Sequence, residues 1–186
     1  MLGAAALGFP DTAGAVTWPW QQGGSSTRGF TFDGLPEEWL RREGRTVSSY
    51  ASFIDGLRLR NITTQQVIGS HAKQRGSVWN SIPPREAWRS VGPTLQVIDR
   101  VSRELNVPVT EVLSVYRNPV YNSLCSGARR NSWHTRNYAV DVKMGAKPST
   151  VAAMAGRLRD RGQFRGGIGR YGDFTHVDTR GTNIDW

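Results

Sequence analysis

Hydrophobic and polar residues recur at regular spacing in several segments after about residue 48. The clearest helical pattern follows Ile82-Pro83-Pro84-Arg85, where proline is tolerated in the first turn of a helix. Gly92-Pro93 interrupts this pattern, so the regular helix is expected from about Pro93 and ends near Asn106. One apolar face is formed by residues three or four positions apart: Trp88, Val91, Leu95, Ile98, Val101 and Leu105.

Further patterns predict shorter elements on both sides of this helix. Thr63-Thr64-Gln65-Gln66 is typical of a capping box and predicts a short helix. Two more helices are expected, one over about 119–124 and one after Ser149, over about 150–161. Alternating or continuous apolar runs predict strands over 55–60, 109–115, 138–143, 166–171 and 174–178, the last two joined by a turn at Gly172-Asp173.

Helices and strands are interspersed, and several strands are joined by short turns. This favours an α+β domain with a mainly antiparallel central sheet and flanking helices, expected over residues 48–186. Residues 1–47 lack periodicity and are interpreted as an N-terminal arm, either a linker or the remnant of an export segment. A secretory signal begins with positive charge, and no Lys or Arg precedes Arg28. Its tryptophans could stack on sugars, but pinning the arm to the domain is the favoured role for Trp18, Trp20 and Trp39.

Composition narrows the class of partner without naming an activity. The chain has 186 residues, which suits one domain, and a formal charge of +9, which favours an anionic partner such as a cell wall. Basic residues are scattered rather than clustered, so a nucleic-acid partner is not expected. No apolar stretch is long enough to predict an integral membrane segment. Cys125 is the single cysteine, which excludes a multi-cysteine metal site.

Two of the three histidines lie beside acidic residues. His134 precedes a predicted strand that carries Asp141, and His176 lies on the last predicted strand. If these strands are neighbours, the three side chains can meet around one ion, and two imidazoles with one carboxylate suffice for a catalytic zinc site. Spacing alone also allows plain surface residues. His71 has no metal-like partner nearby and is interpreted as a loop histidine.

Several ordered motifs carry a resemblance to a known family. They are Ser132-x-His134-x6-Asp141, then Gly166-Gly167-Ile168-Gly169-x-Tyr171-x-x-Phe174-x-His176-x-Asp178, preceded by Tyr116-Arg117. Over roughly Pro83 to Trp186 the chain resembles the D-alanyl-D-alanine carboxypeptidase-like metallopeptidases (peptidase family M15). That group includes peptidoglycan-cleaving carboxypeptidases and murein endopeptidases. The resemblance implies a DD-peptidase/hedgehog-like fold.

The resemblance also implies roles for individual residues. It implies one Zn²⁺ per chain, bound by His134, Asp141 and His176. It suggests that Arg117 contacts the substrate carbonyl or carboxylate and that Ser132 helps to place the peptide. The chemistry is coherent, since zinc activates water and polarises a carbonyl, while a guanidinium can donate a forked pair of hydrogen bonds to an oxyanion.

A carboxylate must still accept the proton of the attacking water and pass it to the leaving amine. Asp173, three residues before His176, matches the acid-x-x-His pattern of related peptidases and is the first candidate. Asp178, on the same strand face as His176, is the second. The chain departs from the family's common pattern at Asn137, where glycine is usual. Asparagine tolerates a left-handed backbone, so the loop is expected to survive.

The resulting hypothesis is a zinc metallopeptidase that hydrolyses peptide bonds in peptidoglycan stem peptides or cross-links, as a D,D-carboxypeptidase or an endopeptidase. Its expected location is the cell envelope, periplasmic or secreted. One alternative is a phage-associated lysin or virion-borne hydrolase with the same chemistry. Another is a catalytically silent, zinc-stabilised binding module, because a fold does not by itself imply turnover.

Overall fold

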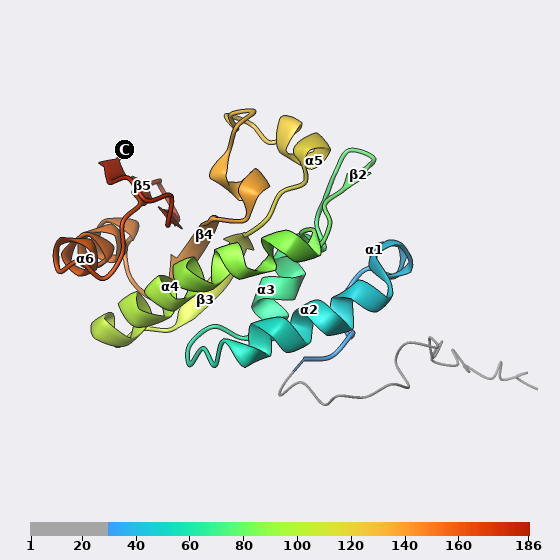
Figure 1. Ribbon diagram of the computed structural model, residues 1–186, viewed down its shortest axis with the longest axis horizontal. Coiled ribbons are helices and arrows are strands. Elements are labelled where there is room, and N and C mark those ends of the chain that lie inside the picture. Colours follow the sequence, from blue (N-terminus) through green and yellow to red (C-terminus); the bar gives the residue numbers. More distant parts are fainter. Residues whose placement is uncertain (1–29) are drawn as a thin grey trace, which may run out of the picture.

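The computed structural model describes residues 30–186 (Figure 1). In this part of the chain a five-stranded sheet has the order β3-β4-β6-β5-β7, and a separate two-stranded hairpin is formed by β1 and β2. The predicted α+β class is confirmed. The α-helices are α1 (Glu37–Glu43), α2 (Arg45–Gly56), α3 (Thr64–His71), α4 (Gly92–Leu105), α5 (Pro119–Ser123) and α6 (Pro148–Asp160). The strands are β1 (Gln74–Arg75), β2 (Val78–Trp79), β3 (Val109–Ser114), β4 (Ala139–Met144), β5 (Gly167–Arg170), β6 (Thr175–Asp178) and β7 (Ile184–Asp185).

The sheet is antiparallel except at one edge. Strand β4 pairs with β3 and β6, and β6 pairs with β5, all antiparallel, whereas β7 runs parallel to β5. The β4–β6 register places Val140 opposite Val177 and Asp141 opposite His176. Because side chains alternate across a strand, one face of this pair is apolar and the other carries the charged residues.

The apolar face of the sheet packs against helices. Helix α4 contacts β4 and β6, and α6 contacts α4, β5 and β6. In Figure 1 the long helix α4 lies along β3, with α6 next to one of its ends. The α4 residues Leu95, Ile98 and Val101 are fully buried, as the periodicity predicts. Burying each such side chain contributes about 1.5–3 kcal/mol, so this packing fixes the strands that carry the polar face.

The part of the predicted arm that the structure describes is folded. Helices α1 and α2 bury Trp39, Leu40 and Val47 in the same hydrophobic core as α4. The Trp39 indole also donates a hydrogen bond of 2.9 Å to the Asn80 carbonyl, so this tryptophan holds the segment in place. Residues 1–29, with Trp18 and Trp20, lie outside the described residues.

Two local predictions are wrong. Residues 55–60 form no strand, because α2 extends to Gly56 and Arg58 has a positive φ of 54°, which strand geometry does not allow. His71 is not a loop histidine but the last residue of α3, and it is fully buried. The capping box between Thr63 and Gln66 is present as predicted. No helix in the described range is both long and apolar enough to cross a membrane.

Candidate metal centre

A short 3-10 turn, η2 (Trp133–Arg136), precedes β4 and carries His134, whose side chain is buried. The Ser132 hydroxyl accepts a hydrogen bond from the His134 backbone N–H at 3.3 Å and caps this turn. Asn137 ends the turn in the left-handed conformation, with φ of 60°, which asparagine tolerates better than most residues. Its side-chain amide donates to the Ala87 carbonyl at 2.9 Å, which ties the turn to the helical layer.

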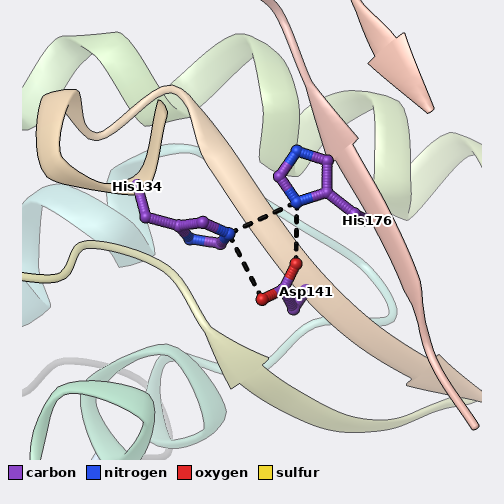
Figure 2. Close-up of side chains that lie close together, drawn as sticks. All are labelled: His134, Asp141 and His176. Carbon is purple, nitrogen blue, oxygen red and sulfur yellow. Dashed lines mark hydrogen bonds and ion pairs between the residues drawn. The ribbon is translucent and has the colours of Figure 1, made fainter. Parts of the chain in front are cut away.

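The structure brings His134, Asp141 and His176 together, with one ligand atom of each within 4.8 Å of the others (Figure 2). The His176 Nδ1 lies 2.8 Å from Asp141 Oδ1, and the His134 Nε2 lies 3.2 Å from Asp141 Oδ2. The two ring nitrogens are 3.3 Å apart. All three side chains are buried. Segments 42 residues apart in the chain therefore converge on one point.

Hydrogen bonds on the far side of each imidazole determine which nitrogen faces this point. The His134 Nδ1 lies 2.6 Å from the Val115 carbonyl, which can only accept, so this nitrogen carries a proton. By the same reasoning the His176 Nε2 donates to the Asp178 carboxylate at 2.9 Å. In their neutral forms both rings therefore direct a lone pair at each other and at Asp141. Three electron-pair donors that converge in a buried space call for a cation between them.

The electrostatics of the cluster agree with this arrangement. Burial lowers the pKa of His134, and the neighbouring Asp141 offsets only part of that effect. Burial acts in the same direction on His176, but hydrogen bonds to Asp141 and Asp178 raise its pKa above the ordinary value. Burial alone would raise the pKa of Asp141, yet His134 and His176 hold it well below its usual range. Asp141 is thus a permanent carboxylate at neutral pH.

Arg117, the predicted substrate contact, lies against the cluster. Its guanidinium forms an ion pair with Asp141, and its Nε donates to the Ser114 hydroxyl at 2.7 Å. Its backbone N–H donates to the His134 carbonyl at 3.2 Å. Arg117 therefore neutralises Asp141 in this structure.

The two candidate general bases occupy different environments. Asp178 is fully buried and accepts hydrogen bonds from His176, from the Gly167 backbone and from Arg180. These bonds use the acceptor capacity of its carboxylate, and although burial alone would raise the pKa of Asp178, they keep it below its usual range. It also contacts the His176 nitrogen that points away from the cluster. This geometry suits a group that orients His176 rather than one that accepts a proton from water.

Asp173 lies in the turn between β5 and β6, and its side chain is 70% exposed. It pairs with Lys143 at 2.8 Å. Lys143 stands two residues after Asp141 on β4, hence on the same face of the strand and roughly 7 Å along it. Asp173 is therefore a solvent-accessible carboxylate, paired with a residue two positions along β4 from Asp141.

Sequence reasoning missed one contributor to the site, Trp186, whose ring lies 5.1 Å from the His176 ring. Arg180, nearby, pairs with Asp178. A signal was available in Gly167 and Gly169, because glycines two apart in a strand indicate that another group approaches the backbone closely. A Cβ at Gly169 would lie 2.7 Å from the Trp186 indole.

The donor set fits zinc. Two imidazole nitrogens and one carboxylate oxygen are the ligands of a catalytic zinc site, with a fourth position left for water. The second hydrogen bond of each imidazole, one to a backbone carbonyl and one to a carboxylate, is the pattern that surrounds zinc-binding histidines. The fold and this cluster define an α+β protein with a buried three-residue group that could hold a metal ion.

Comparison with known proteins agrees with that class. A family model described as Peptidase M15 matches residues 60–178, which is more than half of the chain. Searches against curated proteins and against solved structures gave no match. The chain belongs to the peptidase M15 family, and this membership supports a peptidase. The matched range contains the three clustered residues, Arg117 and both candidate bases.

Proposed function

We propose that this protein is a zinc-dependent peptidase that hydrolyses peptide bonds in the stem peptides or cross-links of peptidoglycan. One observation carries the proposal: in a member of the M15 family, His134, Asp141 and His176 direct their unshared electron pairs at one buried point. The charge of +9 supports action on an anionic wall polymer, and hence a place in the cell envelope or a phage lysin.

The chain's own residues supply the remaining chemistry. Zinc, when bound by His134, Asp141 and His176, would polarise the scissile carbonyl and lower the pKa of water. Asp173 accepts a proton from the attacking water and delivers it to the leaving amine, while the water oxygen forms the new carboxylate. Arg117 donates hydrogen bonds to the carbonyl oxygen as it gains negative charge, or to a terminal carboxylate of the substrate.

The environment of Asp173 supports its role. Its partner Lys143 also lies within reach of Glu111, at 3.9 Å, so Lys143 has an alternative carboxylate partner. Lys143 can therefore release Asp173 when a peptide and water enter. No comparable freedom exists for Asp178, which is buried and fully hydrogen-bonded.

The test is digestion of purified sacculi by the zinc-loaded protein, with the released muropeptides identified by mass spectrometry. We expect one zinc per chain, products of peptide-bond hydrolysis, loss of activity on chelation and recovery when zinc is restored. Asp173→Asn should lower the rate by about 100- to 10,000-fold while zinc content is unchanged.

Glu104→Gln is the matched control, because Glu104 is another carboxylate in a surface ion pair, 2.7 Å from Arg100 on α4. It should retain full activity. A zinc-loaded protein that releases no peptide fragments would contradict the enzyme and favour a silent binding module. Full activity in Asp173→Asn would instead remove Asp173 from the mechanism and leave the rest of the proposal in place.

A further inference from the structure

One arginine lies between two tryptophans next to the candidate metal centre. The Arg180 guanidinium carbon is 5.2 Å from the centre of the Trp133 ring and 5.2 Å from that of the Trp186 ring. Both distances are within the range of cation–π attraction. We call these three side chains the Trp-Arg-Trp stack.

The stack connects the two segments that carry the histidines. Trp133 immediately precedes His134 in η2, and the Trp186 ring packs against the His176 ring with centroids 5.1 Å apart. The turn that bears His134 and the strand that bears His176 are 42 residues apart in the chain and are also linked by the β4–β6 pairing. The stack adds a side-chain connection between the two segments.

Arg180 is fixed by a paired carboxylate as well as by its two ring contacts. Its Nε donates to Asp178 Oδ1 at 2.7 Å, and a second guanidinium nitrogen pairs with Oδ2 of the same carboxylate. Asp178 in turn accepts from the His176 Nε2 at 2.9 Å. The forked geometry of arginine allows this pairing and both stacking contacts at once, which lysine cannot reproduce.

Trp186 is held by strand β5. Its backbone N–H donates to the Ile168 carbonyl at 3.2 Å, and its carbonyl accepts from the Arg170 N–H at 2.9 Å. The indole lies over Gly167 and Gly169, where a Cβ atom would come within 2.9 and 2.7 Å of the ring. The sheet thus provides a recess for this indole, although 47% of the residue is exposed to solvent.

We propose that the Trp-Arg-Trp stack is a brace that sets the separation of His134 and His176 and so prepares them for a metal ion. Trp133, Arg180 and Trp186 are positioning residues in this proposal, since they act through the two histidines. The proposal rests on the proposed function only in its consequence for metal binding. The coupling between the two segments belongs to the metal-free protein and can be measured there.

The first measurement is zinc affinity, by competition with a chromophoric chelator. Trp186→Ala and Arg180→Lys should each weaken zinc binding by about 10- to 100-fold, the usual effect of removing groups that orient metal ligands. Trp186→Phe keeps an aromatic ring over His176 and should stay within about threefold of the wild type. Arg136→Ala is the matched control. Arg136 also stacks on Trp133, at 5.0 Å, but it is not part of the brace.

The second measurement is hydrogen–deuterium exchange in the metal-free protein. The amides of Asn137 and Tyr138 report on η2, because they donate to the carbonyls of His134 and Trp133 at 3.1 and 3.0 Å. Trp186→Ala should accelerate exchange over residues 132–138 by about 10-fold or more, although the substitution lies in a different segment. Arg136→Ala removes only one contact to Trp133 and should accelerate exchange over these residues much less than Trp186→Ala does.

The outcomes separate the brace from the proposed function. Unchanged zinc affinity and unchanged exchange in folded Trp186→Ala and Arg180→Lys would overturn the brace and leave the zinc peptidase intact. A wild-type protein that binds no zinc would overturn the proposed function. The exchange data alone would then show whether the stack couples the two segments. A general loss of protection over the whole chain in both variants, with Trp186→Phe equally affected, would show a structural role only and also overturn it.

Discussion

Two regions of the molecule bury histidine, and they treat it in opposite ways. At the sheet, His134 and His176 each donate a hydrogen bond from one ring nitrogen, and the other ring nitrogen of each faces Asp141. In the helical layer, His71 packs edge-on against Tyr50, with ring centroids 5.4 Å apart. Among the described residues neither of its ring nitrogens has a partner in ordinary hydrogen-bond geometry.

The difference shows that burial alone does not define the charge of a histidine. Burial lowers the pKa of His71 to about 3, and an interaction with the Tyr116 backbone offsets little of this. His176 is almost as deeply buried, yet two carboxylates raise its pKa. His71 is therefore a neutral packing residue, whereas the carboxylates beside His176 favour a proton or a cation there.

The largest effect on the sheet histidines is expected from removing the carboxylate that lies between them. Asp141→Ala leaves Arg117 and His176 without their shared counter-charge in a buried site. We expect the metal-free variant to lose about 3–5 kcal/mol of unfolding free energy, measured by urea denaturation. A loss below about 1 kcal/mol would mean that solvent reaches the site and compensates these charges.

Removal of the outer carboxylate should have a smaller effect. Asp178→Asn keeps the shape of the side chain but weakens its hold on His176, so zinc affinity should fall about 10- to 100-fold in a chelator competition. Asp99→Asn is a matched control, because Asp99 is also buried and accepts two backbone hydrogen bonds, but lies beside Arg60 and Asn61 instead. Equal zinc affinity in the wild type and in Asp178→Asn would contradict the orienting role.

The helical histidine should appear in the pH dependence of stability. The pKa of His71 is about 3 in the folded protein and about 6.5 when unfolded, so the unfolded chain binds the extra proton between these values. The contribution of neutral His71 to the free energy of unfolding is fully present above about pH 6.5, and it is lost as the pH decreases toward 3. Between pH 7 and pH 5 the wild type should lose about 2 kcal/mol more than His71→Phe, because other titrating groups act equally in both proteins. Parallel profiles would show that His71 is protonated in the folded state.

The smallest effect concerns the ring beside His71. The Tyr50 hydroxyl is buried without a hydrogen-bond partner in ordinary geometry, and although the Asn137 side chain lowers its pKa in part, burial raises it overall. Tyr50→Phe should therefore be neutral or should stabilise the protein by up to about 1 kcal/mol in thermal unfolding. Thr94→Val is the control, since the Thr94 hydroxyl donates to the Tyr138 carbonyl at 2.8 Å, and its loss should destabilise. Destabilisation by Tyr50→Phe equal to that control would imply a hidden partner.

Much of the sheet and of its polar face follows from short-range patterns. The periods of α4, β4 and β6 are visible in the sequence because each element buries one face. Helix α2 was not predicted, although its buried residues have helical spacing: Val47, Tyr50, Ala51 and Ile54. The polar residues that precede it carry no such pattern. Strand β7 has only two residues and no period to recognise.

The site itself was predictable only in part. The types and spacing of His134, Asp141 and His176 suggested a shared centre, but not which ring nitrogens face it. That is determined by Val115 and Asp178, whose contacts depend on the final packing. The different environments of Asp173 and Asp178 likewise arise from tertiary structure, because both are aspartates within three residues of His176.

The alignment of β4 with β6 has one more consequence. Since neighbouring residues of a strand point to opposite sides, a shift of the pairing by a single position would bring Val177 or Thr175 opposite Asp141 instead of His176. Such a shift would leave His134 and Asp141 in contact but remove His176 from the centre. A metal ion bound by all three residues would stabilise this alignment of the two strands relative to any shifted one, and so favour the correct pairing as the sheet assembles.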